Sequence, residues 1–211
     1  MSFSLRAGIA IPILYFGTVI VSSLFYPGYN HVRQYASELG SAEAPLPMLF
    51  NGGILLTGIA SLVAAPGFVA ALRRLRGNAV LAWLLAIILA LFGVSMIMGG
   101  LFPMPDPRHG GFGLGLGVHA GPALLAAALW RREDARLLRG FLLVTTVLVV
   151  AMFAIMMGVG GLVTRANVGV FQRVYALTLF PWMGIGSWAL LRRVSSRAEG
   201  QAGMPASRVD I

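Results

Sequence analysis

Residues 79–101 read AVLAWLLAIILALFGVSMIMGGL, a continuous stretch without a single charged side chain. A helix needs about 20 mostly apolar residues to cross the hydrocarbon core of a bilayer, and this stretch is long enough. Comparable stretches lie on both sides of it. Together they predict six membrane-spanning helices at about residues 5–26, 48–72, 79–101, 113–130, 140–163 and 168–191.

The composition of the whole chain supports the same fold class. Of its 211 residues, 58% are hydrophobic and 11% are charged, and the mean hydropathy is +0.83. Soluble domains carry about 25% charged residues, so this chain has too few to cover a water-facing surface. Open sheets are excluded from lipid because backbone groups must be paired there. The sequence therefore predicts an all-α, polytopic membrane protein.

Some kinds of chemistry are excluded by residues that the chain lacks. There is no cysteine, which excludes disulfides, thiolate metal sites and cysteine nucleophiles. All 16 basic residues are arginine, so Schiff-base chemistry and the lysine of a phosphate-binding loop are excluded as well.

Most of the arginines fall on one side of the predicted spans. Because short arginine-rich segments stay in the cytoplasm, both termini are expected to be cytoplasmic, in a multi-pass protein of the cytoplasmic (inner) membrane. Because the arginines gather beside the membrane, we expect the net charge of +9 to attract anionic membrane lipids. We expect no nucleic acid as a partner. One six-helix domain is predicted over residues 1–193, followed by a disordered cytoplasmic tail over residues 194–211.

Polar side chains gather on the opposite, outer side, in the loops after the first and third spans and at the start of the sixth. We expect them to form an outward-facing polar pocket that binds an amphiphile such as a lipid headgroup. Glu38 and Asp106 are the available counter-ions for two nearby arginines. Arg165 and Arg173 would then hold an anionic group such as phosphate. The predicted ligand-binding residues are Tyr35, Ser37, Glu38, Asn51, Arg165, Gln172 and Arg173.

An alternative function is a lipid hydrolase or transferase that acts at the outer leaflet. A histidine would serve as general base, or would help to hold a metal ion that activates water. Ser37 is a candidate nucleophile, or it caps a short helix. The simpler interpretation of the histidines is a set of structural hydrogen bonds. The candidate catalytic residues are His109, His119, Asp106 and Glu38, and the candidate ligands of a divalent metal such as zinc are Asp106, His109 and His119.

Gly113, Gly117 and Gly121 recur every four residues, which predicts that they share one face of a helix. Small residues let helices approach closely in lipid, so this face is expected to pack against another helix or against a second copy of the chain. Two further interpretations stay open. One is a transporter, which polarity at only one end disfavours, and the other is a non-catalytic subunit that partners another membrane protein.

Several motifs of the outer loops resemble a known family. The segments YASELG at residues 35–40, FNGG at 50–53 and LFPMPD at 101–106 resemble the domain of unknown function 998 family, small six-helix membrane proteins of bacteria and archaea. The resemblance implies a fold and a location, but no reaction. The acidic loop motif is also similar to Frag-type membrane proteins associated with remodelling of GPI-anchor lipids, which favours a lipid ligand. By the family resemblance, the recurring polar positions are Ser37, Glu38, Asn51, Pro103, Asp106 and His109.

Overall fold

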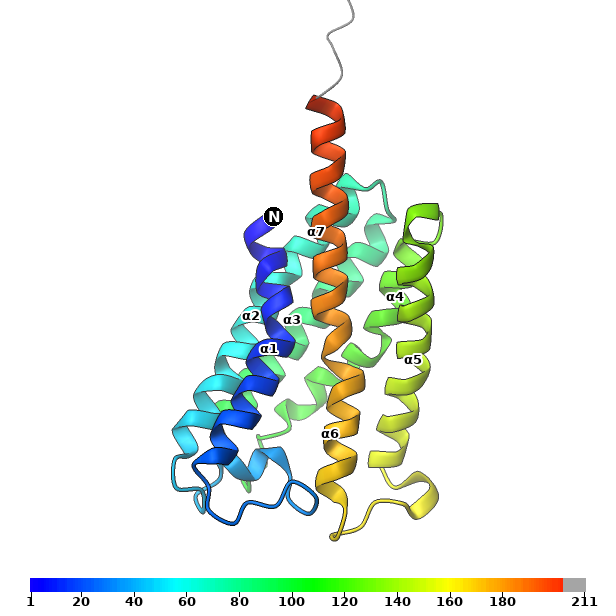
Figure 1. The fold of residues 1–211 in the computed structure, drawn as a ribbon. Helices are drawn as coiled ribbons and strands as arrows, with labels where there is room; N and C mark the ends of the chain where they lie inside the picture. Colours follow the sequence, from blue (N-terminus) through cyan, green and yellow to red (C-terminus); the bar gives the residue numbers. More distant parts are fainter. Residues whose placement is uncertain (203–211) are drawn as a thin grey trace, which may run out of the picture.

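Helices form every regular element of the described chain, residues 1–202 of the computed structural model (Figure 1). Six helical segments are long and apolar enough to cross a membrane, which confirms the predicted all-α, multi-pass fold class. The α-helices are α1 (Ser2–Leu24), α2 (Pro47–Arg74), α3 (Ala79–Leu101), α4 (Gly121–Ala128), α5 (Arg136–Met156), α6 (Val168–Leu179) and α7 (Pro181–Ala202). The 3-10 segments are η1 (Ala36–Gly40), η2 (Gly111–Ala120), η3 (Glu133–Ala135) and η4 (Val159–Gly161).

The uncharged stretch at residues 79–101 forms α3 over its whole length. Its first turn is capped by Asn78, whose side-chain oxygen accepts hydrogen bonds from the backbone N–H groups of Val80 and Leu81 at 2.9 and 3.2 Å. The helix ends before Phe102 because the residue that precedes a proline is driven out of the helical conformation.

Two glycines bring α2 and α3 into close contact. A Cβ atom on Gly58 would lie 2.6 Å from the backbone oxygen of Gly93, and a Cβ atom on Gly93 would lie 2.7 Å from the oxygen of Gly58. No larger residue permits this approach, which is the packing that apolar helices use in lipid. Nearby, the buried Ser61 hydroxyl donates to the carbonyl of Leu89 at 2.7 Å. These contacts fix the position of α3 in the bundle.

The fourth predicted span, residues 113–130, is not one α-helix. Its first half belongs to the 3-10 segment η2, and only Gly121–Ala128 is α-helical. Phe112 and Gly113 take φ values of 52° and 76°, which interrupts the regular helix. The glycine-rich run explains the difference, because glycine accepts positive φ readily and weakens a helix.

Gly113, Gly117 and Gly121 therefore do not share one helix face. A 3-10 helix has three residues per turn, so a spacing of four residues moves around its axis. Gly121 is buried against the ring of Trp182 in α7, whereas the other two glycines are exposed. The close packing at Gly121 thus lies within the chain, and association of two copies through this segment stays a prediction.

The last two spans differ from the predicted ones in where their helices begin and end. α5 begins at Arg136 and ends at Met156 rather than near residue 163, because Gly158 takes a φ of 97°. The sixth span is divided at Pro181, which lacks the N–H that a continuous helix requires. α6 and α7 nevertheless follow one another along the bundle in almost the same direction (Figure 1).

α7 continues through Ala202, whereas the sequence predicts a disordered tail from residue 194. Within this extension, Nη1 of Arg197 donates to the carbonyl of Arg74 at the end of α2, at 3.0 Å. That contact supports the helix beyond its apolar part. The remainder of the predicted tail, residues 203–211, lies outside the described residues.

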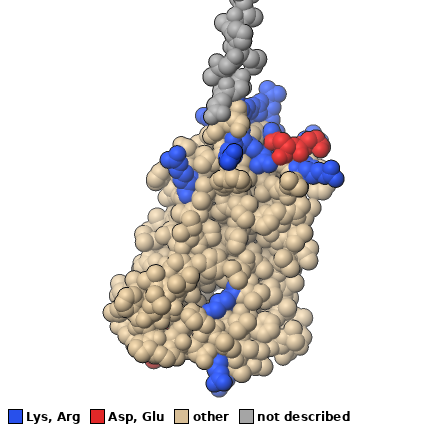
Figure 2. All heavy atoms as spheres, viewed as in Figure 1, with Lys and Arg blue, Asp and Glu red and all other residues tan. Residues whose placement is uncertain are grey.

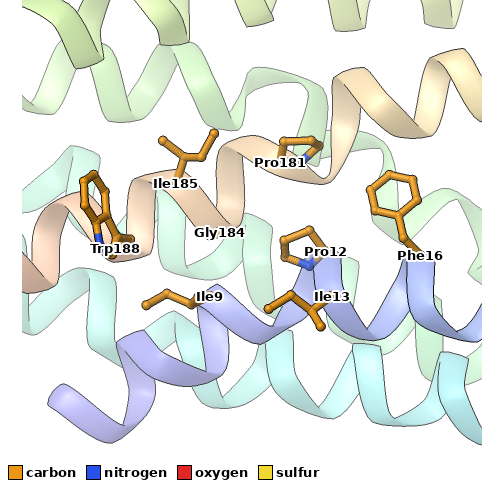
Figure 3. Close-up of a pocket in the computed structure, with 8 residues that line it drawn as sticks. All are labelled: Ile9, Pro12, Ile13, Phe16, Pro181, Gly184, Ile185 and Trp188. Atoms are coloured by element: carbon orange, nitrogen blue, oxygen red, sulfur yellow. The ribbon is translucent and has the colours of Figure 1, made fainter.

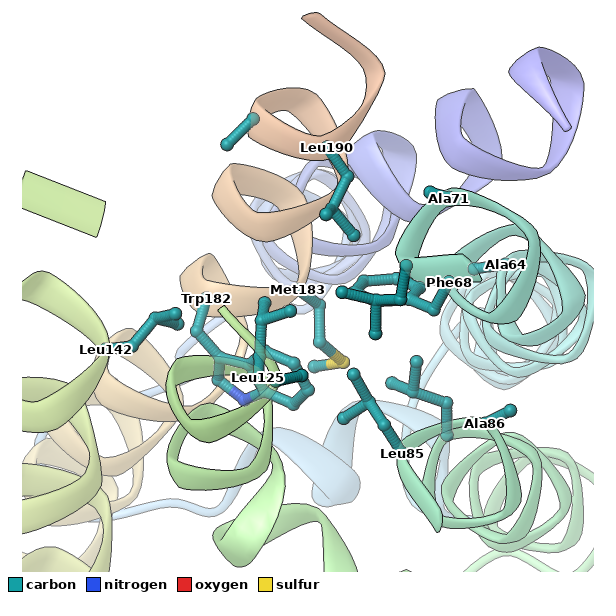
Figure 4. Close-up of a cluster of buried hydrophobic side chains, with 14 of the residues drawn as sticks. Ala64, Phe68, Ala71, Leu85, Ala86, Leu125, Leu142, Trp182, Met183 and Leu190 are labelled. Carbon is teal, nitrogen blue, oxygen red and sulfur yellow. The ribbon is translucent and has the colours of Figure 1, made fainter. Parts of the chain in front are cut away.

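The buried core lies where α7 meets the helices around it. Figure 4 shows Trp182 and Met183 of α7 among side chains that include Phe68 of α2 and Leu125 of α4, and all four are fully buried. The outer surface is apolar as well: Val147 on α5 is 68% exposed, and the pocket between α1 and α7 in Figure 3 is lined by aliphatic and aromatic residues. Helices that are hydrophobic on all sides are typical of a protein embedded in lipid.

The two ends of the bundle differ in charge. The N-terminus and the end of α7 lie together at one end (Figure 1), and Figure 2 shows most of the basic side chains gathered there. We call this the arginine end. The opposite end is formed by the connections over residues 25–46, 102–110 and 157–167, and we call it the loop end. It carries the polar residues that the sequence singled out.

Candidate functional site

A cavity of about 190 Å³ lies at the loop end between α1, α2, α3, α6 and the connections that cover them. No arginine, aspartate or glutamate is among the ten residues that line it, and five of the ten are apolar. We call it the loop-end cavity. Its polar lining residues are Tyr15, Ser37, Ser95, His109 and Gln172.

His109 is held in one orientation at the edge of this cavity. Its Nδ1 lies 3.0 Å from the carbonyl oxygen of Phe102, seven residues earlier in the same connection. A carbonyl oxygen can only accept a hydrogen bond, so Nδ1 carries the hydrogen. In the neutral ring, Nε2 is then left with a lone pair, and among the described residues it has no hydrogen-bond partner, on a side chain that lines the cavity.

A second cavity of about 190 Å³ shares Ser95 with the first. His119 and Tyr175 line it, and the ring of Phe153 lies 4.4 Å from that of His119. The Nδ1 of His119 lies 2.6 Å from the carbonyl of Leu116, and the Tyr175 hydroxyl donates to Nε2. Both nitrogens of His119 are thus engaged within the chain. We call this space the His119 cavity.

Arg173, a predicted ligand-binding residue, does not line either cavity. Its Nη1 donates to the backbone carbonyls of Gln34 at 2.9 Å and Gly169 at 2.8 Å, and its Nη2 donates to the Tyr29 hydroxyl. Its Nε donates to Nδ1 of His31 at 3.2 Å. The guanidinium therefore ties the first connection to α6, and most of its N–H groups are used.

Burial and the charge of Arg173 shift the pKa values of Tyr29 and His31, the two side chains bonded to it. Burial raises the pKa of the Tyr29 hydroxyl in spite of the nearby Arg173, so the phenol stays protonated at neutral pH. It therefore accepts from Arg173 and donates to the carbonyl of Tyr35 at 2.8 Å. Partial desolvation, together with the charge of Arg173, lowers the pKa of His31.

Glu38 is not the counter-ion of Arg173 that the sequence predicts. Its carboxylate accepts hydrogen bonds from the backbone N–H of Tyr35 at 2.7 Å and from the side-chain amide of Gln34 at 3.0 Å. A carboxylate three residues into a helical turn is well placed to satisfy the free N–H groups there. Glu38 thus closes the first turn of η1.

Two further predicted ligand-binding residues hold the same short segment in place. The side-chain oxygen of Gln172 accepts a hydrogen bond from the backbone N–H of Ala36 at 2.6 Å, and the amide of Asn51 donates to the carbonyl of Gly40 at 2.9 Å. These bonds attach the start of η1 to α6 and its end to α2. Tyr35 contributes only backbone groups to the side-chain hydrogen bonds of this region.

Asp106 and Arg165 are also placed differently from the prediction. Asp106 pairs with Arg108 two residues later, at 2.7 Å, and these bonds hold the pKa of its carboxyl well below the usual range, at about 2. Arg165 is exposed in the connection before α6. Within residues 1–202, no three histidine and acidic side chains lie close enough to hold a metal ion. The predicted metal set of Asp106, His109 and His119 is therefore not brought together.

Ser37 lines the loop-end cavity, but it is not bonded to a histidine there. Its hydroxyl donates weakly to Sδ of Met104 at 3.6 Å. It is also not a helix cap, because the residue at that position is Tyr35. The structure thus brings Ser37, His109 and Gln172 to one cavity and leaves Glu38, Asp106 and Arg173 outside its lining.

Two lining residues, Tyr15 and Ser95, are not among those predicted from the sequence. Ser95 is the only residue with a hydroxyl in the stretch 79–101, and it lines both cavities. A polar side chain in such a span usually faces the bundle interior, so the isolated hydroxyl of Ser95 could have been predicted to lie there. Tyr15 stacks on Phe180 with ring centroids 3.8 Å apart. Tyr15 lies near the middle of α1, so its hydroxyl gives the same kind of signal as that of Ser95.

Comparison with known proteins agrees with the resemblance carried by the loop motifs. The family described as "Protein of unknown function (DUF998)" matches residues 9–189, which include four of the six spans, most of the first and the sixth, and both cavities. No curated protein and no solved structure gave a match. The chain therefore belongs to the DUF998 family.

Proposed function

We propose that the loop-end cavity binds the polar head of a membrane amphiphile, and that the head is uncharged. The observation that carries this proposal is the lining itself, whose polar groups are hydroxyl, imidazole and amide groups beside apolar side chains, with no arginine, aspartate or glutamate among them. Ligand sites are typically apolar hollows with a few well-placed polar groups. The acyl chain of such a ligand would lie against the apolar helices.

The side chains of the cavity suit a small head that carries hydroxyl or ester groups. Nε2 of His109 would accept a hydrogen bond from a ligand hydroxyl, and the hydroxyls of Tyr15 and Ser95 would donate or accept. A cavity of about 190 Å³ suits a head no larger than a glycerol ester. The phosphate that Arg165 and Arg173 would have held is not part of this proposal, because neither arginine lines the cavity.

The orientation of the protein belongs to the same proposal. Short arginine-rich segments remain cytoplasmic, so the arginine end would face the cytoplasm and the loop end the outer leaflet of the cytoplasmic membrane. The amphiphile would then come from the outer leaflet. A non-catalytic role beside another membrane protein is compatible with such a site and stays a prediction.

Native mass spectrometry of gently extracted protein tests the proposal with a monoacylglycerol as the probe. The monoacylglycerol is expected to bind, and Ser95→Ala to weaken its binding about threefold to tenfold, the usual effect of one hydrogen bond. Ser23→Ala is the matched control, because that exposed hydroxyl bonds only to the carbonyl of Ile20. Equal affinities of the wild type and both variants would contradict the proposal.

A second candidate function is hydrolysis of an ester lipid in the same cavity. It is favoured by His109, whose Nδ1 is fixed and whose Nε2 is free, with two serine hydroxyls in the same lining. A serine oxygen would attack the ester carbonyl and pass its proton to Nε2, which returns it to the departing alcohol. Water would then release the acyl group. A fluorophosphonate probe is expected to label the wild type and to lose that labelling in Ser95→Ala or Ser37→Ala if this candidate holds.

A further inference from the structure

A larger pocket of about 670 Å³ lies at the opposite, arginine end, where the connection between α4 and α5 meets α7. Four arginines line it, together with one carboxylate and one hydroxyl. We call it the arginine pocket. Its residues are Arg132, Asp134, Arg192, Arg193, Ser196 and Arg197.

The charges inside this pocket do not balance. Asp134, the single acidic residue of its lining, is shared by two arginines. Arg132 donates to its two oxygens at 3.0 and 3.1 Å, and Nε of Arg193 lies 3.2 Å from it. Among the described residues, Arg192 and Arg197 form no ion pair. The lining therefore carries an excess positive charge that an anion would neutralise.

Backbone carbonyls hold three of these arginines in place. Nη1 of Arg132 donates to the carbonyl of Leu75 at 3.2 Å, and Nη2 of Arg193 donates to that of Asp134 at 2.7 Å. Arg197 is held by the α2 carbonyl described above. Carbonyls orient a guanidinium without cancelling its charge. Ordering the side chains before binding lowers the entropic cost of taking up a ligand.

Exposed tryptophans place the pocket at the level of lipid headgroups. The guanidinium of Arg192 lies 5.4 Å from the ring of Trp188, and that of Arg139 lies 5.6 Å from the ring of Trp130. Both rings are more than half exposed. Exposed tryptophans gather at the interface between hydrocarbon and water, so the adjacent arginines reach the lipid phosphates.

We propose that the arginine pocket binds the phosphate of an anionic phospholipid from the leaflet at this end. Arginine matches phosphate in both geometry and charge, and basic pockets between membrane helices commonly hold such headgroups. This site is separate from the loop-end cavity, since it takes an anionic head at the opposite end of the bundle. The failure of either proposal leaves the other unaffected.

The test uses full-length protein and native mass spectrometry with phosphatidylglycerol, phosphatidylcholine and inorganic phosphate as probes. Phosphatidylglycerol is expected to bind the wild type at least about tenfold more tightly than it binds the variant Arg192→Gln/Arg197→Gln, because this variant lacks two charge-assisted contacts. The matched control is Arg131→Gln/Arg136→Gln, which removes the same charge at the same end from exposed residues outside the pocket. It is expected to change the affinity less than twofold.

Three results would overturn this assignment. They are equal losses in the two double variants, equal binding of phosphatidylglycerol and phosphatidylcholine, and displacement of the lipid from the wild type by millimolar inorganic phosphate. The last would mean that the pocket takes phosphate from solution. Should the double variant fail to fold, Arg192→Gln alone replaces it. Among the described residues Arg192 makes no side-chain hydrogen bond, so folding is not expected to depend on it.

Discussion

The Nδ1–H of His109 donates to the carbonyl oxygen of Phe102 at 3.0 Å, and this bond leaves Nε2 of a cavity-lining imidazole free. The two nitrogens therefore have separable roles: one holds the connection after α3, and the other is available to a ligand. Asparagine and glutamine can imitate the two positions separately, because Asn places an amide near Nδ1 and Gln places one near Nε2.

His109→Asn is expected to keep the thermal stability of the wild type and to bind a monoacylglycerol about threefold to tenfold more weakly, since it keeps the donor to Phe102 and loses the acceptor. His109→Gln is expected to show the reverse, with a lower midpoint of unfolding and binding closer to that of the wild type. Thermal unfolding and native mass spectrometry measure the two effects. A loss of both properties in both variants would show that the roles are not separable.

Arg173 is expected to contribute to stability rather than to ligand binding. Arg173→Gln removes the bonds from α6 to the first connection, and we expect the free energy of unfolding to fall by about 2 kcal/mol, within the range for hydrogen bonds to charged groups. Urea-induced unfolding in detergent measures it. Arg165→Gln, in an exposed position, is the control and is expected to change stability by less than about 0.5 kcal/mol. A large effect of Arg165→Gln would contradict this interpretation.

The contact between His31 and Arg173 predicts that the stability of the protein depends on pH. The pKa of His31 is lowered in the folded protein by desolvation and by Arg173, so the neutral ring is favoured there. Its contribution to stability is complete above the unfolded pKa, near 6.5, and is lost as pH falls through the folded value. Thermal unfolding is therefore expected to occur at lower temperature as pH falls from 7 to 5. His31→Asn should flatten that part of the profile, and an unchanged slope in this variant would assign the effect to another group.

The orientation can be measured with single cysteines, because the chain contains none of its own. Ala42 at the loop end and Ser195 at the arginine end are both exposed. In intact cells, a membrane-impermeant maleimide is expected to label Ala42→Cys, and to label Ser195→Cys only after lysis. Labelling of Ser195→Cys in intact cells would reverse the proposed orientation and with it the leaflet that supplies each ligand.

The spans could be predicted from the sequence because their length and apolarity are set by the bilayer. The six-helix class and the whole of α3 follow from runs such as residues 79–101. The 3-10 segment η2 could not be predicted, because apolarity alone does not distinguish it from an α-helix. The glycines that shape η2 are also typical of helix packing in membranes.

Much of the candidate site was beyond sequence reasoning for a different physical reason. Arg173 was expected to pair with Glu38, but both satisfy backbone groups of the first connection, and backbone partners leave no mark in a sequence. His109 was identified because histidine is chemically distinctive. Ser95 was detectable only as an isolated hydroxyl in an apolar span, and its position between two cavities depends on how η2 covers α3.

Photo-crosslinking tests most directly whether the loop-end cavity holds a neutral polar head. A monoacylglycerol with a diazirine on its glycerol would be incorporated into membranes that contain the protein, irradiated, and mapped by peptide mass spectrometry. We expect crosslinks in the peptides that contain Ser95 and His109, with competition by unlabelled monoacylglycerol and none by phosphatidylglycerol. Crosslinks spread along the apolar outer faces of the helices, with none at these two peptides, would contradict the account.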